Sequence, residues 1–542
     1  MTAPLPSPTP DAPGAPDAPA PSAPRPIRFV HQGRIVAVDG LAPTTSVLAW
    51  LREHARCTGT KEGCAEGDCG ACTVVIAEPA PPDTEPAGSA GTAAAVIDGL
   101  LLRTVNACIQ FQPTLDGKAL LTVEDLGAIS GGALHPVQQA LVDCHGSQCG
   151  FCTPGFAMSL ACAYEHHQAA GTRPGRQALA DALSGNLCRC TGYRPILDAG
   201  ERMFDAPPVR LDTAALKAQL AELALDAPLH YTGPSAAAST SQPGRTDALH
   251  APRTLDELAA LRLARPDARL LAGATDIGLW VNKQFRDLGE VIYLGRVDAL
   301  KRIDLEDGHL VIGAAAALED AWAALVRHRP ELRELWLRFA SPPIRHAGTL
   351  GGNLANGSPI GDGAPALIAL DARLRLRRGT AVREVALDAF YLDYMRNDLA
   401  AGEFVQAIVV PLPGPRHLRA YKVSKRHDSD ISAVCAGLAL GLDADGRIAH
   451  VRLAYGGMAA TVRRAAQAEA ALRGQPWSEP ALLAAQAALA QDFTPLSDMR
   501  ASAAYRLRVA QNLLRRFWLE TREEAPLPPA ATRVWATDEA TP

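Results

Sequence analysis

Four cysteines near the N-terminus have the spacing of an iron–sulfur ligand set. Cys64, Cys69 and Cys72 lie in the segment GTKEGCAEGDCGAC, and Cys108 follows after 35 intervening residues. The pattern C-x4-C-x2-C with a distant fourth cysteine is typical of plant-type [2Fe–2S] sites. The glycines between the cysteines allow backbone bends, so that three thiolates can converge from one loop. A structural zinc site is the alternative, but zinc sites more often use two C-x2-C pairs.

A second group of four cysteines follows. Cys149 and Cys152 lie in SQCGFCTPG, and Cys188 and Cys190 lie in GNLCRCTGYRP. A C-x2-C facing a C-x-C supplies four thiolates, two for each iron of a second [2Fe–2S] cluster. Taken alone, this pair of motifs fits zinc as well as iron–sulfur. The neighbouring plant-type pattern favours iron–sulfur, because two clusters in adjoining domains form a path for electrons.

The remaining cysteines are expected to be structural. Of the 12 cysteines, 11 lie in the first 190 residues, a local concentration that favours metal or redox chemistry over a disulfide framework. Each remaining cysteine lies beside or within an apolar pattern, where a free thiol acts as a small hydrophobe. These residues are Cys57, Cys144, Cys162 and Cys435.

The elements around the first cysteines predict a compact α+β unit. Residues 27–40 alternate apolar and polar side chains around Gln32 and Gly33, which predicts a hairpin. Residues 44–55 predict a helix with a threonine cap, and residues 72–77 predict a short strand. Residues 78–95 are rich in Pro, Gly and Ala and predict an inserted loop.

The rest of the chain divides into helical and mixed parts. Between residues 114 and 207 three segments have helical apolar spacing, and the cysteines fall at their ends. Residues 208–243 become rich in Ala, Ser, Gly and Pro, which predicts a linker. Mixed strands and helices then run to Pro413, followed by strands and two amphipathic helices, at about residues 465–473 and 502–519.

Composition excludes several classes of partner. The formal net charge is −5 and the 53 basic and 58 acidic side chains are interspersed, so neither nucleic acid nor an anionic membrane is an expected partner. No apolar run reaches the roughly 18 residues of a membrane span. The Pro-rich and Ala-rich start lacks the pattern of a signal peptide. We therefore expect a cytoplasmic protein.

Long segments of the chain resemble the molybdenum hydroxylases, in particular the xanthine dehydrogenase group. GTKEGCAEGDCGACTV, VNACIQ, LHPVQQAL, SQCGFCTPGFAMS and GNLCRCTGYRPI are similar to the iron–sulfur half of that family. LLAGATDIG, HAGTLGGNLANGSPIGD and YKVSKRHDSDIS resemble its FAD domain, and SDMRASAAYRLRV resembles its C-terminal segment. The resemblance covers roughly residues 27–520.

The resemblance implies an α+β multidomain fold. In this family a molybdopterin part should follow, but this chain stops at Pro542, so it resembles the separate small subunit of bacterial xanthine dehydrogenases. The expected parts are a disordered tail (1–26), a β-grasp 2Fe-2S ferredoxin domain (27–113), a helical 2Fe-2S domain (114–207), a linker (208–243), a vanillyl-alcohol-oxidase-type α+β FAD domain (244–413), an α+β C-terminal flavoprotein domain (414–520) and a tail (521–542).

The resemblance also implies which residues bind the cofactors. Cys64, Cys69, Cys72 and Cys108 would hold the cluster nearer the flavin, and Cys149, Cys152, Cys188 and Cys190 the cluster nearer the molybdenum. Gln148 would touch the pterin held by the partner. The implied FAD contacts are Arg269, Leu270, Leu271, Ala272, Gly273, Ala274, Thr275, Asp276, Phe339, Gly348, Thr349, Leu350, Gly351, Gly352, Asn353, Asp362, Val405 and Lys422. The small-residue loops suit close approach to a pyrophosphate, and Lys422 could add a positive charge.

The function implied by the resemblance is electron transfer. Hypoxanthine and then xanthine would be hydroxylated, giving urate, at the molybdenum of a molybdopterin-binding large subunit. Electrons would pass through the two clusters to FAD and on to NAD, in a heterotetramer of two small and two large chains. This chain would supply no catalytic residue for the hydroxylation. The loop SKRHDSD falls at the family's flavin-side access loop, and it reads equally well as a solvated charged loop.

Two alternatives remain open from the sequence. The chain could serve another molybdenum hydroxylase that acts on an N-heterocycle or an aldehyde, because substrate choice would lie on the partner. It could also be a zinc-binding interaction scaffold without a redox role.

Overall fold

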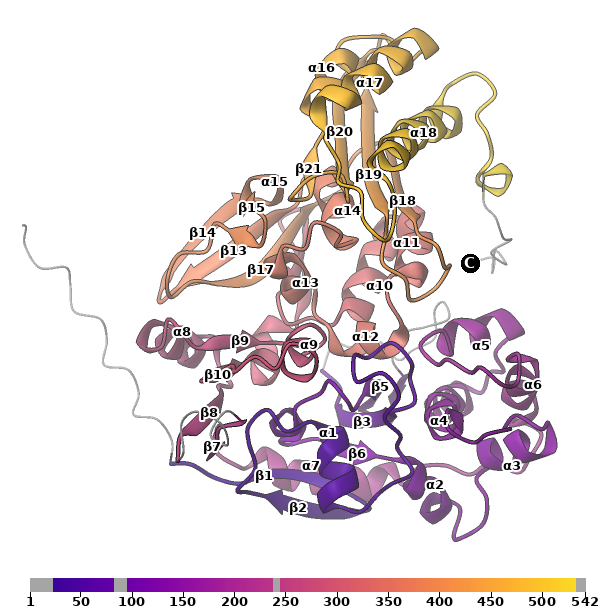
Figure 1. The fold of residues 1–542 in the computed structure, drawn as a ribbon, viewed down its shortest axis with the longest axis vertical. Helices are drawn as coiled ribbons and strands as arrows, with labels where there is room; N and C mark the ends of the chain where they lie inside the picture. Colours follow the sequence, from indigo (N-terminus) through magenta and orange to yellow (C-terminus); the bar gives the residue numbers. More distant parts are fainter. Residues whose placement is uncertain (1–22, 82–94, 237–243, 533–542) are drawn as a thin grey trace, which may run out of the picture.

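The computed structural model describes residues 23–81, 95–236 and 244–532. Three regions follow one another along the long axis of the molecule in Figure 1. The first sheet and the helical cysteine region lie at one end, the region with residues 244–413 lies in the middle, and the C-terminal region lies at the other end. The expected disordered tail and the inserted loop fall largely outside the described residues.

A six-stranded mixed sheet forms the first region, in the order β2-β1-β6-β3-β5-β4. The predicted hairpin is confirmed, because β1 and β2 pair antiparallel. Its turn residues Gln32 and Gly33 have φ values of 49° and 69°, as a two-residue hairpin turn requires. The strands are β1 (Ile27–His31), β2 (Arg34–Val38), β3 (Thr73–Pro79), β4 (Ala95–Ile97), β5 (Leu100–Asn106) and β6 (Ala119–Leu121).

A short helical segment packs on this sheet. It comprises α1 (Val47–Ala49) and a π-helical turn (Trp50–His54). The predicted threonine cap is wrong by one or two residues: the Ser46 hydroxyl accepts a hydrogen bond from the Ala49 amide at 3.0 Å. Ser46 takes this role because it directly precedes the helix and has extended backbone angles. The Trp50 ring meets the Phe29 ring edge-on, with 5.0 Å between their centroids.

The helical region covers the other side of this sheet. The three segments predicted to be helical are confirmed as α3, α4 and α5. The long helix α4 packs against β3, β4 and β5 and buries Phe156, Met158 and Leu160. The helices are α2 (Val123–Ile129), α3 (Pro136–Asp143), α4 (Thr153–Ala170), α5 (Arg176–Ala182) and α6 (Arg194–Arg202).

The segment 208–243, predicted as a linker, contains ordered elements. Helix α7 (Thr213–Ala224) and strand β7 (Leu229–Pro234) lie within it. Helix α7 returns to the first sheet and contacts β1 and β3. Its buried leucines, Leu216, Leu220 and Leu223, have helical spacing that the surrounding alanines make hard to recognise in the sequence.

Two sheets form the middle region. The smaller sheet has the order β7-β8-β10-β9, and β8, β10 and β9 are parallel. The larger sheet has the order β11-β12-β17-β13-β14. The strands are β8 (Thr246–Ala251), β9 (Arg269–Leu271), β10 (Val291–Tyr293), β11 (Ile303–Glu306), β12 (His309–Gly313), β13 (Arg373–Arg378), β14 (Ala381–Ala386) and β17 (Phe404–Pro411).

Short helices connect and cover these strands. A small hairpin, β15 (Tyr391–Asp393) with β16 (Arg396–Asn397), stands beside them. The helices are α8 (Leu255–Ala264), α9 (Ile277–Asn282), α10 (Leu318–His328), α11 (Arg333–Arg338), α12 (Pro342–Ala347), α13 (Leu350–Asn356), α14 (Gly363–Ala369) and α15 (Leu387–Phe390).

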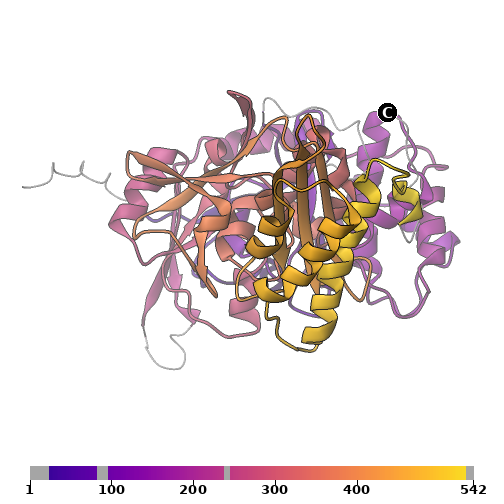
Figure 2. The same cartoon turned by 90° about the horizontal axis from the view of Figure 1, so that it is seen from above.

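The C-terminal region is a four-stranded antiparallel sheet with helices on one side (Figure 2). Helix α14 packs against the same sheet and joins it to the middle region. The two predicted helices are confirmed as α16 and α18, and α17 lies between them in sequence. The elements are β18 (His417–Val423), β19 (Val434–Leu442), β20 (Ile448–Gly456), β21 (Arg463–Arg464), α16 (Ala466–Leu472), α17 (Glu479–Asp492) and α18 (Ala503–Thr521).

Within residues 23–81, 95–236 and 244–532, no helix combines the length and the apolar character that crossing a bilayer would require.

Candidate iron–sulfur and flavin sites

The first cysteine group, Cys64, Cys69, Cys72 and Cys108, gathers at one end of a strand pair. Cys72 directly precedes β3, and Cys108 follows β5 by two residues. The antiparallel register pairs Thr73 with Asn106, so both cysteines come to the same end of the sheet. The loop that leads from the short helical segment to Cys72 brings Cys64 and Cys69 close, and the Cys69 amide lies 3.4 Å from the Cys64 sulfur.

The thiols of this group contact one another. Hydrogen bonds from the Cys108 and Cys69 side chains lower the pKa of Cys64. The pKa of Cys108 is raised by its hydrogen bonds to Cys64 and Cys72 and by burial. A thiolate at Cys64 is therefore stabilised by its neighbours, which is the form that binds iron.

The second cysteine group, Cys149, Cys152, Cys188 and Cys190, lies at the start of α4 and before α6. Cys152 directly precedes α4. The pKa of Cys149 is lowered by the Phe151 amide and then by the Cys190 thiol. The pKa of Cys152 is raised to about 12 by burial and by its hydrogen bond to Cys188. Cys149 and Cys190 are exposed, so this group lies at the protein surface.

The two cysteine groups are joined by direct backbone contact. The Leu187 amide donates to the Cys69 carbonyl at 3.0 Å, and the Asn186 side chain donates to the Gly70 carbonyl at 3.1 Å. A Cβ placed on Gly70 would lie 2.2 Å from the Gly185 carbonyl oxygen, and the φ of Gly70 is 69°. Only glycine allows this approach. Sequence reasoning missed this role of Asn186, although it lies within the cysteine motif.

The arrangement of thiols fits a dinuclear cluster. The thiol contacts run from Cys69 through Cys64 and Cys108 to Cys72. Such an extended set matches ligands that are shared between two irons.

The expected flavin residues form two loops that touch. The flavin loop, residues 269–276, includes β9 and leads into α9; the second loop, residues 348–353, includes the start of α13. A Cβ on Gly273 would lie 2.0 Å from the Ala347 carbonyl oxygen and 2.6 Å from the Gly348 Cα. The Thr349 hydroxyl accepts from the Gly352 amide at 3.0 Å. The two loops therefore meet backbone to backbone, and the small residues that this approach requires are those that could also admit a phosphate-bearing cofactor.

Lys422 is neutralised by a buried carboxylate. Its ammonium forms an ion pair with Asp362, and the two side chains are 1% and 10% exposed. The ammonium also donates to the Asp430 carbonyl at 2.7 Å and to the Ser432 hydroxyl at 3.0 Å. The structure thus brings Lys422 and Asp362 together, and the pair carries no net positive charge.

The other expected contacts lie in three places. A Cβ on Gly363 would lie 2.6 Å from the Asn353 side-chain oxygen and 3.9 Å from the Phe339 ring, so these residues lie beside Asp362. Val405 is buried on β17, which packs against α13. Gln148 is exposed and directly precedes Cys149 of the second cysteine group.

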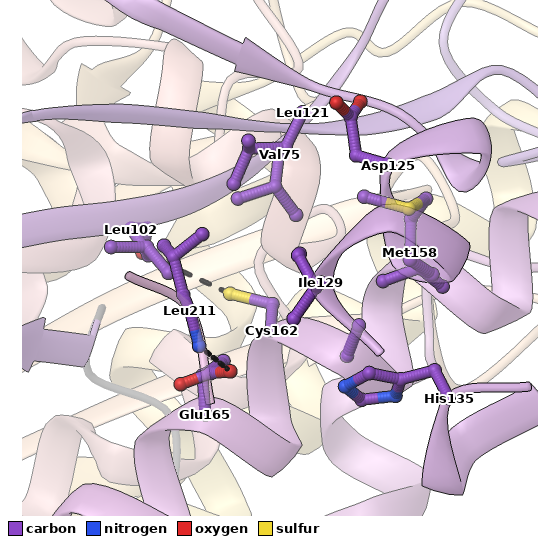
Figure 3. A pocket seen from close by; sticks show the side chains of 12 residues that line it. Val75, Leu102, Leu121, Asp125, Ile129, His135, Met158, Cys162, Glu165 and Leu211 are labelled. Carbon is purple, nitrogen blue, oxygen red and sulfur yellow. Dashed lines mark hydrogen bonds between the residues drawn. The ribbon is translucent and has the colours of Figure 1, made fainter. Parts of the chain in front are cut away.

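The cysteines expected to be structural lie outside both groups. Burial raises the pKa of Cys57 and Cys435, so both are neutral thiols. Burial also raises the pKa of Cys162 to about 12. This thiol faces the Leu102 carbonyl in a cavity between the first sheet and the helical region (Figure 3). The cavity measures about 20 Å³, room for about one water molecule, and is far too small for a cofactor.

Three family descriptions match separate parts of the chain. Residues 122–201, which include the second cysteine group, match a [2Fe-2S] binding domain. Residues 244–413 match the FAD binding domain in molybdopterin dehydrogenase. Residues 419–521 match the CO dehydrogenase flavoprotein C-terminal domain.

Individual proteins match over most of the chain. Xanthine dehydrogenase from Emericella nidulans is 31% identical over 544 residues, covering 91% of this chain and 38% of that protein. Aldehyde oxidase 2 from Rattus norvegicus is 29% identical over 544 residues, covering 92% of this chain and 39% of that protein. This chain therefore spans less than two fifths of the length of these relatives.

A solved carbon monoxide dehydrogenase from Hydrogenophaga pseudoflava is 29% identical, with a TM-score of 0.46, and covers 49% of this chain and 94% of its own. The domain matches and the similarity to the first two proteins agree with the cysteine and flavin geometry. The chain therefore belongs to the molybdenum hydroxylase family, as a [2Fe–2S] and FAD part homologous to the N-terminal region of xanthine dehydrogenases.

Proposed function

We propose that this chain relays electrons from a molybdenum centre on a partner chain, through two [2Fe–2S] clusters, to FAD and on to NAD. The partner would bind molybdopterin and hydroxylate hypoxanthine and xanthine, giving urate. Two copies of each chain would form a heterotetramer in the cytoplasm. The similarity to xanthine dehydrogenases supports this choice of activity.

Direct contacts between the two cysteine loops are the main support for the proposal. Leu187, the residue before the expected ligand Cys188, donates its backbone amide to the carbonyl of Cys69, an expected ligand of the other cluster. On the other side, the Gln110 side chain donates to the Gly273 carbonyl of the flavin loop at 2.9 Å. The second cysteine group, the first group and the flavin loop are thus linked in that order, which is the order an electron relay requires.

The surface around the second cysteine group supports a partner on that side. Cys149 and Cys190 are exposed. Phe151, Leu187 and Tyr193 are 47%, 36% and 39% exposed beside them. Exposed apolar side chains around a redox site favour docking of another protein there.

The chain itself binds, spaces and insulates the cofactors. When bound, each cluster accepts and releases single electrons and the flavin passes them on to NAD. Cys72 and Cys108 of the first group are buried, whereas Cys149 and Cys190 of the second group are exposed, so the second group is the more accessible to a partner. The difference in exposure gives the relay one accessible end.

Another molybdenum hydroxylase activity is the second candidate. The similarity to a rat aldehyde oxidase, 29% identical over 92% of this chain, supports it. In that case the same relay would serve a partner that oxidises aldehydes or N-heterocycles.

Metal and flavin analysis of the purified chain tests the relay. About four iron, four acid-labile sulfide and one FAD per chain are expected for two [2Fe–2S] clusters and one flavin. Zinc in place of iron, without flavin, would refute the relay and favour a zinc scaffold. NADH formation by the complex with its partner, with xanthine or with aldehydes as substrate, then separates the two activities.

A further inference from the structure

Helix α9 follows the flavin loop in the sequence and contacts the first cysteine group. It starts at Ile277, immediately after the flavin loop, and ends at Asn282. Its first turn presses against the residue after Cys108: a Cβ on Gly278 would lie 2.6 Å from the Ile109 carbonyl oxygen. In Figure 1, α9 lies at the edge of the middle region that faces the first sheet.

Asn282 bonds to both arms of the first cysteine group. Its side-chain amide donates to the Cys108 carbonyl at 2.7 Å and to the Ala65 carbonyl at 3.2 Å. Ala65 follows Cys64 and has a φ of 54°, a left-handed conformation that side chains disfavour. One amide group thus holds together two chain segments that are distant in sequence, one of them strained.

Gln110 makes the reciprocal contact. It lies two residues after Cys108, and its side-chain amide donates to the Gly273 carbonyl of the flavin loop at 2.9 Å. Gln110 is buried, 6% exposed. The helix after the flavin loop and the cysteine segment therefore each contribute one side-chain amide that donates to backbone carbonyls of the other.

We propose that Asn282 and Gln110 are positioning residues that together fix the first cysteine group relative to the flavin loop. This inference rests on the electron relay proposed above. Both side chains hold backbone carbonyls next to the expected ligands or the expected flavin contacts, and neither is an expected ligand itself. Removing either amide loosens the contact between the cysteine loop and the flavin loop, which alters the environment of one cluster and its coupling to FAD.

Three substitutions in the full-length, cofactor-loaded chain test this role. Asn282→Ala removes both donors on one side, Asn282→Asp keeps the side-chain size but removes the donors, and Gln110→Ala removes the donor on the other side. Gln486→Ala is the matched control, because Gln486 also donates its amide to a backbone carbonyl, that of Gln511, at 2.7 Å in the C-terminal region.

The readouts separate positioning from folding. Low-temperature electron paramagnetic resonance of the reduced protein gives one signal per cluster, and Cys64→Ser identifies the signal of the first group. We expect this signal and its midpoint potential to change in the Asn282 and Gln110 variants, while the other signal stays constant. The rate of electron transfer from cluster to flavin should fall about ten-fold, as for other residues that orient metal ligands. Gln486→Ala should change none of these.

Two results would overturn the inference. Signals, potentials and transfer rates equal to those of the unsubstituted protein would show that the two amides position nothing. Equal changes in both cluster signals would show a general loss of structure instead. Failure of the relay is distinguishable: the unsubstituted protein would then hold reduced clusters that never reduce its FAD.

Discussion

Breaking the Lys422–Asp362 pair tests whether buried charges hold the two flavin-associated regions together. Asp362 precedes α14 in the middle region, and Lys422 lies on β18 of the C-terminal sheet. The pair is almost fully buried. Lys422→Met leaves the carboxylate without its cation, which typically costs about 3–5 kcal/mol. Asp362→Asn leaves the ammonium unpaired and should cost a similar free energy of unfolding.

The double variant isolates the pairwise interaction. With both charges removed, the remaining cost is the loss of ordinary hydrogen bonds, about 1 kcal/mol each. We therefore expect the double variant to be at least about 3 kcal/mol more stable than the sum of the single variants predicts.

Urea unfolding of the FAD-loaded chain, followed by circular dichroism and flavin release, measures these differences. Arg302→Met is the control, because Arg302 and its partner Asp304 are 65% and 39% exposed and the pair should contribute under about 1 kcal/mol. Additive single effects would refute the reasoning.

Three further predictions concern the cysteine loops and one histidine. Gly70→Ala should destabilise the chain by more than the roughly 1–2 kcal/mol of a left-handed side chain, because its methyl group would meet the Gly185 carbonyl; melting temperature measures this. Cys149→Ser should remove one of two cluster signals, whereas Cys57→Ala should retain both in the same resonance experiment. Burial and then nearby arginines lower the pKa of His346 from 6.5 to about 3. As pH falls through that window the unfolded chain binds a proton that the folded chain does not, so stability should drop by up to about 1.4 kcal/mol per pH unit. A pH titration of stability should be flatter for His346→Gln.

Local patterns allowed much of the fold to be predicted. The hairpin at Gln32 follows from alternation and a turn dipeptide, and α4 follows from helical spacing. The ordered helix α7 was missed because Ala-rich and Pro-rich composition around it favoured a linker. Its three leucines become decisive only once the sheet that buries them is known.

The site could be predicted where chemistry dictates residue type. Cysteine spacing identifies both thiol groups, because iron accepts few side chains. Asn282 and Gln110 carry no such signal: their partners are backbone carbonyls more than 100 residues away, which no local pattern reveals. Lys422 was expected to contribute a positive charge, and its neutralisation by Asp362 depends on the packing of β18 against α14.

The return of α7 to the first sheet affects the order in which the chain can fold. The sheet is complete in strands once residue 121 is synthesised, but the leucines that cover it from α7 lie about 100 residues later. In the sequence, the helical cysteine region thus lies between two segments that pack into one hydrophobic core. During synthesis the N-terminal sheet must wait for that region to emerge before its core closes. A fragment ending at residue 121 should therefore expose apolar surface and aggregate, because it lacks both α4 and α7, which contact strands of this sheet.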